Sequence, residues 1–516
     1  TDDRELTLRI TRFDLPDLRE FSDLLPKEGG LRLDGGRGVI RGRFTLRGRR
    51  ETLDFTVDAK DVDLNFRDTP IRGDLTLRGR SVGNLKSERM ALRDVALDFE
   101  GTTATDAGAR PVRFRIDLGD TDIRLPNRQE GRKLRLASGV LKLNGYVDDL
   151  GWWETPLAGE DWLKLQGRAS LQATLSVRET PKGIALGAPS AITAELPDLV
   201  AVLGDWRAAA KGELRGQLES TGSRLSLDLD GPTLSQEGQP NLYLPTLRLE
   251  ATGPRLTGGR KVEGVRVRLD AEPAELPSLS MLNAYLPEGK LQFESGLGAL
   301  RGYLELSKDR ADAAFELHSD GAVAQVSGKT VSARIDLDAD LSSADPSSRR
   351  LRINRGEVLL RDVLFADIPN PTGNWWALGK IRDGWVTAAK PIALDAEVEM
   401  RLRDPQPIVH LVGEERRTLQ WLARVLDIKD VHGTGRMILD DGGLRFEDLD
   451  IRGDDLVVRG HIDLEEPVRS LLLIQYRQFF VGVEKSGEDR NLRLFRPSEW
   501  FEERSRLWHE QPRSTR

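Results

Sequence analysis

Apolar and polar residues alternate one by one along most of this chain. In the stretch 163–177, every second residue is Leu, Gly, Ala or Val, and the residues between them are charged or polar. Successive side chains of a β-strand point to opposite faces, so each such stretch predicts a strand with one apolar and one charged face. Strands covered on both faces would be apolar throughout, so the alternation predicts a sheet with one wet face.

Short breaks of Gly, Asp and Asn separate these stretches, which is typical of antiparallel meanders. A helical period is rare: the segment 415–426 carries apolar residues at i, i+3, i+4 and i+7. Further short helices are predicted at 16–25, 196–203, 278–285 and 497–510. The predicted fold class is therefore mainly β, with antiparallel strands and a few short capping helices.

An internal repeat relates distant parts of the chain. The segment LLPKEGGLRLDGGRGVIRGRFTL, from Leu24, aligns with YLPEGKLQFESGLGALRGYLEL, from Tyr285, and fainter copies begin at Leu199 and Trp421. The shared glycines are Gly36, Gly38 and Gly42 in the first copy and Gly296, Gly298 and Gly302 in the second. Their spacing differs from a dinucleotide fingerprint and a strand follows them, so we expect them to mark bulges or tight bends.

Repeats that stack edge to edge favour an elongated sheet over separate globules. Five segments are predicted: 1–195, a first β-segment with a short N-terminal helix; 196–277, a middle repeat; 278–413, a third repeat; 414–485, a helix-plus-strand repeat; and 486–516, a C-terminal amphipathic helix.

The inward positions of the predicted strands are aliphatic, and aromatic residues make up only 6% of the chain. A long sheet folded into a trough would leave part of this apolar face uncovered, which is typical of a ligand groove. The predicted lining residues are Ile40, Phe44, Leu46, Leu53, Phe55, Val57, Leu163, Leu165, Leu171, Leu175, Val177, Val331, Ile335, Leu394 and Val398. The same pattern also fits a closed core beneath a second sheet, so both interpretations stay open.

The helix-plus-Gly-strand unit and alternating strands such as LSLDLD resemble the AsmA-like superfamily of bacterial envelope proteins, which includes TamB. The resemblance covers nearly the whole chain. It implies an elongated, taco-shaped β-groove in the periplasm of a diderm bacterium, anchored to the inner membrane. It also implies non-enzymatic transport of phospholipid or a related lipid towards the outer membrane, with lipid acyl chains as the ligand and membrane proteins at the groove ends as partners.

Composition narrows the chemistry further. The 516 residues include no cysteine, which excludes disulfides, thiolate metal sites and cysteine nucleophiles. The formal net charge is −7, with acidic and basic residues interleaved, so nucleic acid is not an expected partner. The five histidines show no metal-ligand spacing and are predicted to lie in loops or on strand surfaces. We therefore expect no enzyme activity, cofactor or metal.

Two aromatic features stand apart from the groove. The tryptophan pairs Trp152–Trp153 and Trp375–Trp376 are candidates for a packed plug, or for a gate over the groove. In the C-terminal helix, Trp500, Phe501, Leu507 and Trp508 form one face, which predicts a cap on the open end of the sheet or a membrane or partner interface.

The first residue is not Met and no run of about 18 apolar residues occurs, so we expect any membrane tether to lie upstream. The leading functional hypothesis is lipid transport across the periplasm. The alternative is a structural or assembly factor for outer-membrane proteins, built as a closed β array.

Overall fold

The computed structural model describes most of the chain as β-strand. The described residues are 5–24, 31–66, 69–84, 89–105, 108–118, 121–124, 139–150, 163–180, 183–203, 206–236, 242–254, 264–287, 291–326, 328–345, 348–366, 374–387, 391–404, 429–440, 443–464, 468–487 and 489–510. The predicted fold class, a mainly β protein with antiparallel strands and few short helices, is confirmed.

The chain forms two compact units. Unit 1 comprises Thr1–Gly238 and Pro245–Leu269, and unit 2 comprises Gln239–Leu244 and Asp270–Arg516. The five segments predicted from the sequence remain a prediction.

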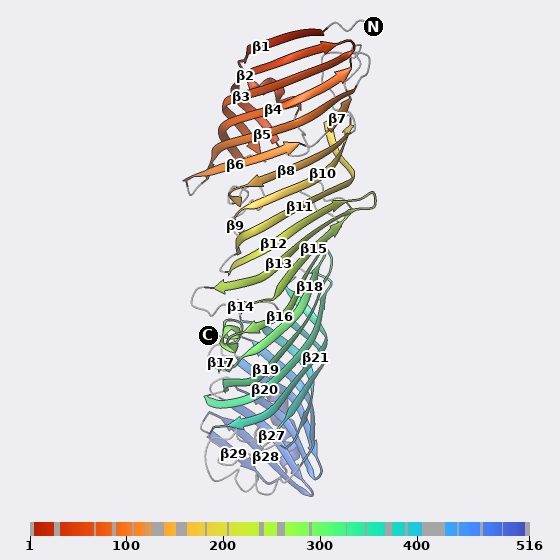
Figure 1. Ribbon diagram of the computed structural model, residues 1–516. Helices are drawn as coiled ribbons and strands as arrows, with labels where there is room; N and C mark the ends of the chain where they lie inside the picture. Colours follow the sequence, from red (N-terminus) through yellow and green to blue (C-terminus); the bar gives the residue numbers. More distant parts are fainter. Residues whose placement is uncertain are drawn as a thin grey trace. The chain divides into compact units, whose positions relative to one another are not determined.

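In unit 1, consecutive strands pair antiparallel from β1 to β6 and from β10 to β13, as Figure 1 shows. The strands are β1 (Glu5–Leu15), β2 (Leu31–Arg47), β3 (Arg50–Phe66), β4 (Thr69–Asn84), β5 (Arg89–Thr105), β6 (Gly108–Leu118), β7 (Thr121–Arg124), β8 (Gly139–Val147), β9 (Leu163–Gln166), β10 (Ala169–Thr180), β11 (Gly183–Leu203), β12 (Trp206–Leu218), β13 (Ser223–Gln236) and β15 (Thr246–Gly253). Strands β6 and β7 follow each other along β5, and β9 and β10 follow each other along β11.

Unit 2 repeats this antiparallel order from β18 to β29. Its strands are β14 (Leu242–Tyr243), β17 (Leu291–Ser295), β18 (Gly298–Leu306), β19 (Ala311–Val326), β20 (Lys329–Ser343), β21 (Arg350–Phe365), β22 (Ala377–Thr387), β23 (Ala393–Leu402), β24 (Val431–Asp440), β25 (Gly443–Gly453), β26 (Leu456–Asp463), β27 (Arg469–Tyr476), β28 (Phe479–Ser486) and β29 (Asp489–Arg493). The division between the units falls within β16 (Arg266–Leu276).

Three of the predicted helices are confirmed. Two are short 3-10 helices, η1 (Leu18–Leu24) and η5 (Leu279–Tyr285), and the third is α4 (Pro497–Glu510). The helix predicted at 415–426 lies outside the described residues. Among the described residues, no helix combines the length and apolar character needed to cross a membrane.

The helix predicted at 196–203 is wrong, because these residues belong to β11. The sequence Leu-Pro-Asp-Leu at 196–199 matches the start of η1 at 15–18, where a strand gives way to a helix. In β11 the chain instead forms a bulge at Pro197 and Asp198 and pairs again beyond it, with β9 on one side and β12 on the other. The ladder hydrogen bonds on both sides favour the strand over a short helix.

Two of the six repeated glycines, Gly36 and Gly296, lie at bends, as predicted. Gly36 and Gly296 adopt φ angles of 121° and 130°, which L-residues with a side chain rarely adopt. A Cβ atom at Gly36 would lie 2.9 Å from the Cα atom of Val62, and one at Gly296 would lie 2.8 Å from the Cα atom of Ala322. Each glycine therefore lets the chain bend against the bulge of the neighbouring strand.

Those bulges often contain an aspartate with a left-handed backbone. Register shifts accompany Asp61, Asp94, Asp362 and Asp448, whose φ angles lie between 50° and 52°. Aspartate tolerates this conformation better than most residues. The next residue is buried in every case, as Val62, Val95, Val363 or Leu449. The bulge thus bends the strand and turns an aliphatic side chain into the core.

Candidate functional site

One continuous row of apolar side chains crosses unit 1. Each member lies directly opposite the next on the neighbouring strand, so all of them share one face of the sheet. We call this row the unit 1 ladder; its members are Phe13, Ile40, Val57, Leu77, Leu97, Ile116, Gly145, Leu171, Ala194, Leu214, Leu227 and Leu249. No polar side chain interrupts it.

A second row of the same kind crosses unit 2. The unit 2 ladder consists of Leu300, Leu317, Leu337, Val358, Gly379, Met400, Gly433, Ile451, Val458, Ile474 and Val481. Every member is aliphatic, Met or Gly, so this row is also free of hydrogen-bonding side chains. The alternation of apolar and polar residues places apolar side chains on one face of each strand. The pairing registers between strands then align these side chains into one long apolar row per unit.

The ladder of unit 1 is only partly covered by protein. Among its side chains only Ala194 is buried, Phe13 is exposed, and the others are half-buried. In unit 2 coverage is greater, because Leu317, Ile451 and Ile474 are buried. A sheet whose inner face was filled by a second layer would bury most of these positions, so unit 1 retains an accessible apolar face.

Most of the residues predicted to line the groove are half-buried in the structure. The half-buried ones are Ile40, Phe44, Leu46, Leu53, Phe55, Val57, Leu165, Leu171, Leu175, Val331, Ile335 and Leu394. Val398 is buried. Leu163 and Val177 lie in β9 and β10, opposite Leu203 and Leu186 respectively. Their assignment as a lipid groove remains a prediction.

Other parts of the apolar face are filled. In unit 1, Leu18 of η1 packs with Val62, Phe99 and Val112 in a buried cluster. In unit 2, Leu279 of η5 packs in the same way with Leu317 and Ala322. Each 3-10 helix thus lies on the part of the sheet next to the bent glycine strand.

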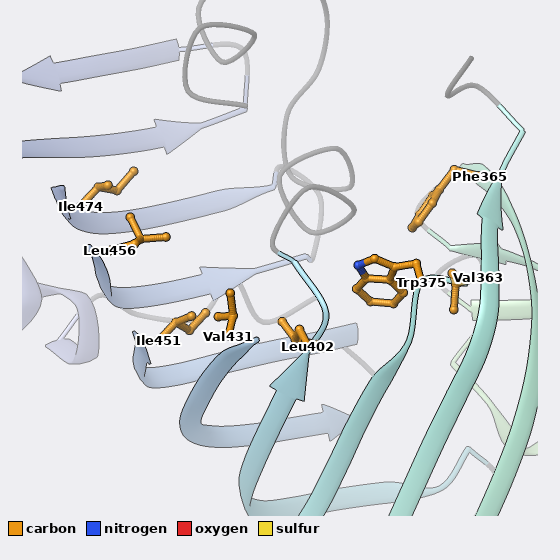
Figure 2. Packing of buried hydrophobic residues seen from close by; sticks show 8 residues of the cluster. All are labelled: Val363, Phe365, Trp375, Leu402, Val431, Ile451, Leu456 and Ile474. Carbon is orange, nitrogen blue, oxygen red and sulfur yellow. The ribbon is translucent and has the colours of Figure 1, made fainter. Parts of the chain in front are cut away.

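Trp375 belongs to the largest described cluster of unit 2. Figure 2 shows it beside Val363 and Phe365, facing Leu402 and Val431. Its indole N–H donates to the carbonyl oxygen of Asp404 over 3.1 Å, which satisfies its polar atom on burial.

The other tryptophans of the two pairs have separate positions. Trp376 is half-buried, with the guanidinium carbon of Arg401 5.9 Å from its ring centre. Trp152 and Trp153 lie outside the described residues. Within the second pair, only Trp375 is therefore buried in the core, as a packed plug would be.

The opposite face of the sheet carries charges paired across strands. In unit 2, Arg436 donates two hydrogen bonds of 2.7 Å to the carboxylate of Asp395. These bonds hold the pKa of Asp395 below its ordinary value, although burial opposes the shift. In unit 1, Arg80 donates to Asp54 over 2.5 Å in the same manner. Such exposed pairs set strand register more than they add stability.

A hollow lies on this charged face of unit 1, not on the apolar face. Its volume is about 950 Å³. The charged lining side chains are Arg9, Arg41, Arg43, Arg78, Arg115, Asp54, Asp94 and Asp117. We therefore do not identify it with the groove that the sequence predicts.

The C-terminal helix packs on the charged side of the last strands. Trp500 lies against Gly482, where a Cβ atom would come within 2.4 Å of the indole ring. The ring centres of Phe501 and Trp508 lie 6.5 and 5.6 Å from that of His461, and Leu507 is exposed. The helix thus covers a face of β27 and β28, while all five residues of the edge strand β29 stay exposed.

The prediction of a surface position for His461 is wrong, because this residue is 2% exposed. Its Nδ1 atom accepts the backbone N–H of Asp448, so its Nε2–H can donate to the Ser505 hydroxyl over 2.7 Å. The sequence signal that was missed is the apolar run Leu471–Ile474 in the neighbouring strand. A continuous run predicts a strand covered on both faces.

Among the described residues, no group of three or more His, Cys, Asp or Glu side chains is placed to hold a metal ion. Each unit thus presents one apolar face, with paired charges on the opposite face of the sheet. No protein-family model, curated protein or solved structure matches the chain.

Proposed function

We propose that this protein transports lipid, without catalysis, by sheltering acyl chains on its apolar face. The observation that supports this most is the unit 1 ladder, which is unbroken over twelve strands yet mostly half-buried. An accessible apolar stripe of this length is costly in water unless a ligand or partner covers it.

The dimensions and chemistry of the ladder suit an acyl chain. At about 4.8 Å per strand, twelve neighbouring strands extend the row over roughly 50 Å. Each methylene transferred from water to such a face gains about 0.8 kcal/mol. Aliphatic side chains contribute only shape complementarity and dispersion, so they can accommodate the acyl chains of lipids with any headgroup. Phospholipid is the ligand class that we propose.

Uniformity of the ladder also supports movement of the ligand. Successive rungs are aliphatic, Phe or Gly, so a chain displaced by one strand exchanges one set of apolar contacts for another. The free energy of burial then changes little along the row, because it depends on apolar area. We propose that lipid slides along this face rather than binding at one fixed point.

The cellular setting follows from the resemblance to the AsmA-like superfamily and is part of the proposal. The protein would act in the periplasm of a diderm bacterium, anchored to the inner membrane. Membrane proteins at the ends of the groove would be its partners. No cofactor is needed for this function.

The test is lipid content after gentle purification, measured by mass spectrometry for two matched variants. Leu77→Lys places a charge in the ladder, whereas Thr76→Lys places one on the opposite face, between Asp58 and Asp98 of the neighbouring strands. We expect phospholipid with the wild type and with Thr76→Lys, and a loss of most of it with folded Leu77→Lys. Lipid-free wild-type protein would contradict the proposal.

The alternative function is a structural or assembly factor with a closed core. The filled cluster around Trp375 in unit 2 favours it, because that part of the apolar face is already occupied by protein side chains. In a closed array Leu77→Lys would unfold unit 1 rather than leave a folded protein without lipid. Circular dichroism of the same two variants therefore separates the two functions.

A further inference from the structure

On the charged face, one row of residues differs in charge between the two units. In unit 1 this row lies next to the ladder on β2 to β5, and each member lies directly opposite the next: Arg41, Thr56, Arg78 and Ala96. The equivalent row of unit 2 lies on β18 to β21 and consists of Arg301, Glu316, Asp338 and Glu357. Each row lines a hollow, of about 950 Å³ in unit 1 and about 440 Å³ in unit 2. The two hollows therefore occupy equivalent places in the repeat.

In unit 2, every acid of the row is paired with a base. Glu316 accepts hydrogen bonds of 2.8 and 2.7 Å from Arg301. The carboxylate of Asp338 lies 3.1 Å from the guanidinium of Arg355, and that of Glu357 lies 3.4 Å from the lysine opposite it. The acids of this row are thus neutralised by the protein itself.

The unit 1 row has neutral residues in place of two of those acids. Thr56 occupies the position of Glu316, and Ala96 occupies the position of Glu357. Arg78 lies between Thr56 and Ala96, so neither neighbouring strand places a carboxylate directly opposite it. Among the described residues, Arg78 forms no hydrogen bond or ion pair through its side chain. Its charge is therefore available to a ligand.

A second arginine of the same hollow, Arg43, is in a similar state. The carboxylate opposite it is that of Asp54, which instead accepts a hydrogen bond of 2.5 Å from Arg80 on the other side. Asp58, also near the row, accepts a hydrogen bond from Arg41. Within the described ranges Arg43 has no ion pair. Five arginines and three aspartates line the hollow, so its lining carries an excess of positive charge.

Two guanidinium groups without a protein partner, in one hollow, suit the binding of phosphate. Each guanidinium presents its N–H donors in a planar fork that matches two phosphate oxygens. Arg43 and Arg78 lie on β2 and β4, so about 10 Å separates their backbones across the sheet, and their long side chains can reach one ligand. A volume of about 950 Å³ admits a ligand larger than a single phosphate ion.

We propose that the hollow of unit 1 binds the phosphate groups of an anionic ligand, with Arg43 and Arg78 as the residues that recognise them. A soluble phosphate ester and a phospholipid headgroup at a membrane surface offer the same chemistry, and the experiment below separates these two sources. The site lies on the face opposite the ladder, so it does not depend on lipid held there. Its failure would leave the proposed function untouched.

The test is isothermal titration calorimetry of the whole chain with pyrophosphate at low salt. Arg78→Gln removes one recognition residue, and Thr56→Glu introduces the acid that unit 2 has at the equivalent position. The control is Arg72→Gln on the same strand, because Arg72 pairs with Asp63 over 2.6 Å and is not among the described lining residues. We expect pyrophosphate to bind the wild type, with affinity about tenfold lower in Arg78→Gln and Thr56→Glu and within about twofold in the control.

Flotation with phosphatidylcholine vesicles that contain phosphatidic acid identifies the source of the phosphate. Pyrophosphate binding without vesicle binding would support the site with a soluble ligand, and vesicle binding that is lost in Arg78→Gln would support it with a lipid headgroup. Arg78 and Arg72 are exposed, so circular dichroism of both variants should match the wild type. Absence of both kinds of binding in the wild type, or equal binding by the wild type and Arg78→Gln, would overturn the proposal.

Discussion

At the scale of single residues, glycines decide where the strands can bend. Gly296 combines a φ of 130° with close contact to the backbone of Ala322, whereas a Cβ atom added at Gly321 would have no neighbour within 4 Å. Gly296 lies between β17 and β18, and Gly321 lies in the bulge of the facing strand β19. The first glycine is therefore required by its backbone conformation and surroundings, and the second is replaceable.

We expect Gly296→Ala to lower the free energy of unfolding by about 2 to 3 kcal/mol, because strain and a backbone clash add. Gly321→Ala should change it by less than about 1 kcal/mol. Urea unfolding of both variants checks this. Equal stability of the two variants would show that the bend at Gly296 does not need glycine.

Charge on the outer face is testable at His318. Its imidazole bonds to the carboxylate of Asp336 over 2.5 Å and lies 3.4 Å from that of Asp320, and Arg361 also donates to Asp336. These carboxylates raise the pKa of His318 above its ordinary value. A raised pKa means that the folded state holds the proton more tightly than the unfolded state.

The stabilisation from His318 is thus fully present below about pH 6.5 and is lost as the pH rises through the raised pKa. NMR titration should place the His318 pKa above about 6.5, and Asp336→Asn should bring it down. The effect on stability is small because His318 is exposed. A His318 pKa below this ordinary value in the wild type would contradict the contact.

At the scale of elements, helix α4 is attached through a few side chains. Trp508 stacks on His461, and the guanidinium carbon of Arg469 lies 5.3 Å from the indole centre. Arg504 donates to Glu484 over 3.0 Å. The adjacent Leu507 is exposed and provides a control on the same helix.

We therefore expect Trp508→Ala to release the helix and Leu507→Ala to leave it in place. Hydrogen exchange over residues 497–510 should become at least about tenfold faster in Trp508→Ala, since a lost stacked aromatic costs more than about 1 kcal/mol. Exchange in β2 to β5 should not change. Slow exchange of the helix in Trp508→Ala would mean that other contacts suffice to hold it.

Elements differ in how far their sequence determines them. The spacing of apolar residues within α4 and within the strands is visible in short stretches of sequence, so both kinds of element were predictable. The segment 196–203 has the same local pattern as η1, and only pairing with β9 and β12 makes it a strand. The burial of His461 and the opposite roles of Trp375 and Trp376 also depend on distant strands, which no local pattern reveals.

At the scale of the whole molecule, one apolar face per unit is the common feature. In unit 1 that face stays half-buried along the ladder, and in unit 2 the cluster around Trp375 fills part of it. The pairing registers that align the ladder were not predictable from alternation alone, because bulges at Asp61, Asp94 and similar positions reset the register. The residues on the apolar face were predictable, but their continuity across strands was not.

Photo-crosslinking through consecutive positions of β4 tests the central claim most directly. A photoreactive amino acid at Leu75, Thr76, Leu77 and Arg78 samples the two faces in turn. If acyl chains lie on the ladder face, lipid adducts form in cells at Leu75 and Leu77 and are absent or weak at Thr76 and Arg78. Adducts of equal yield at all four positions, or at none, would contradict the account.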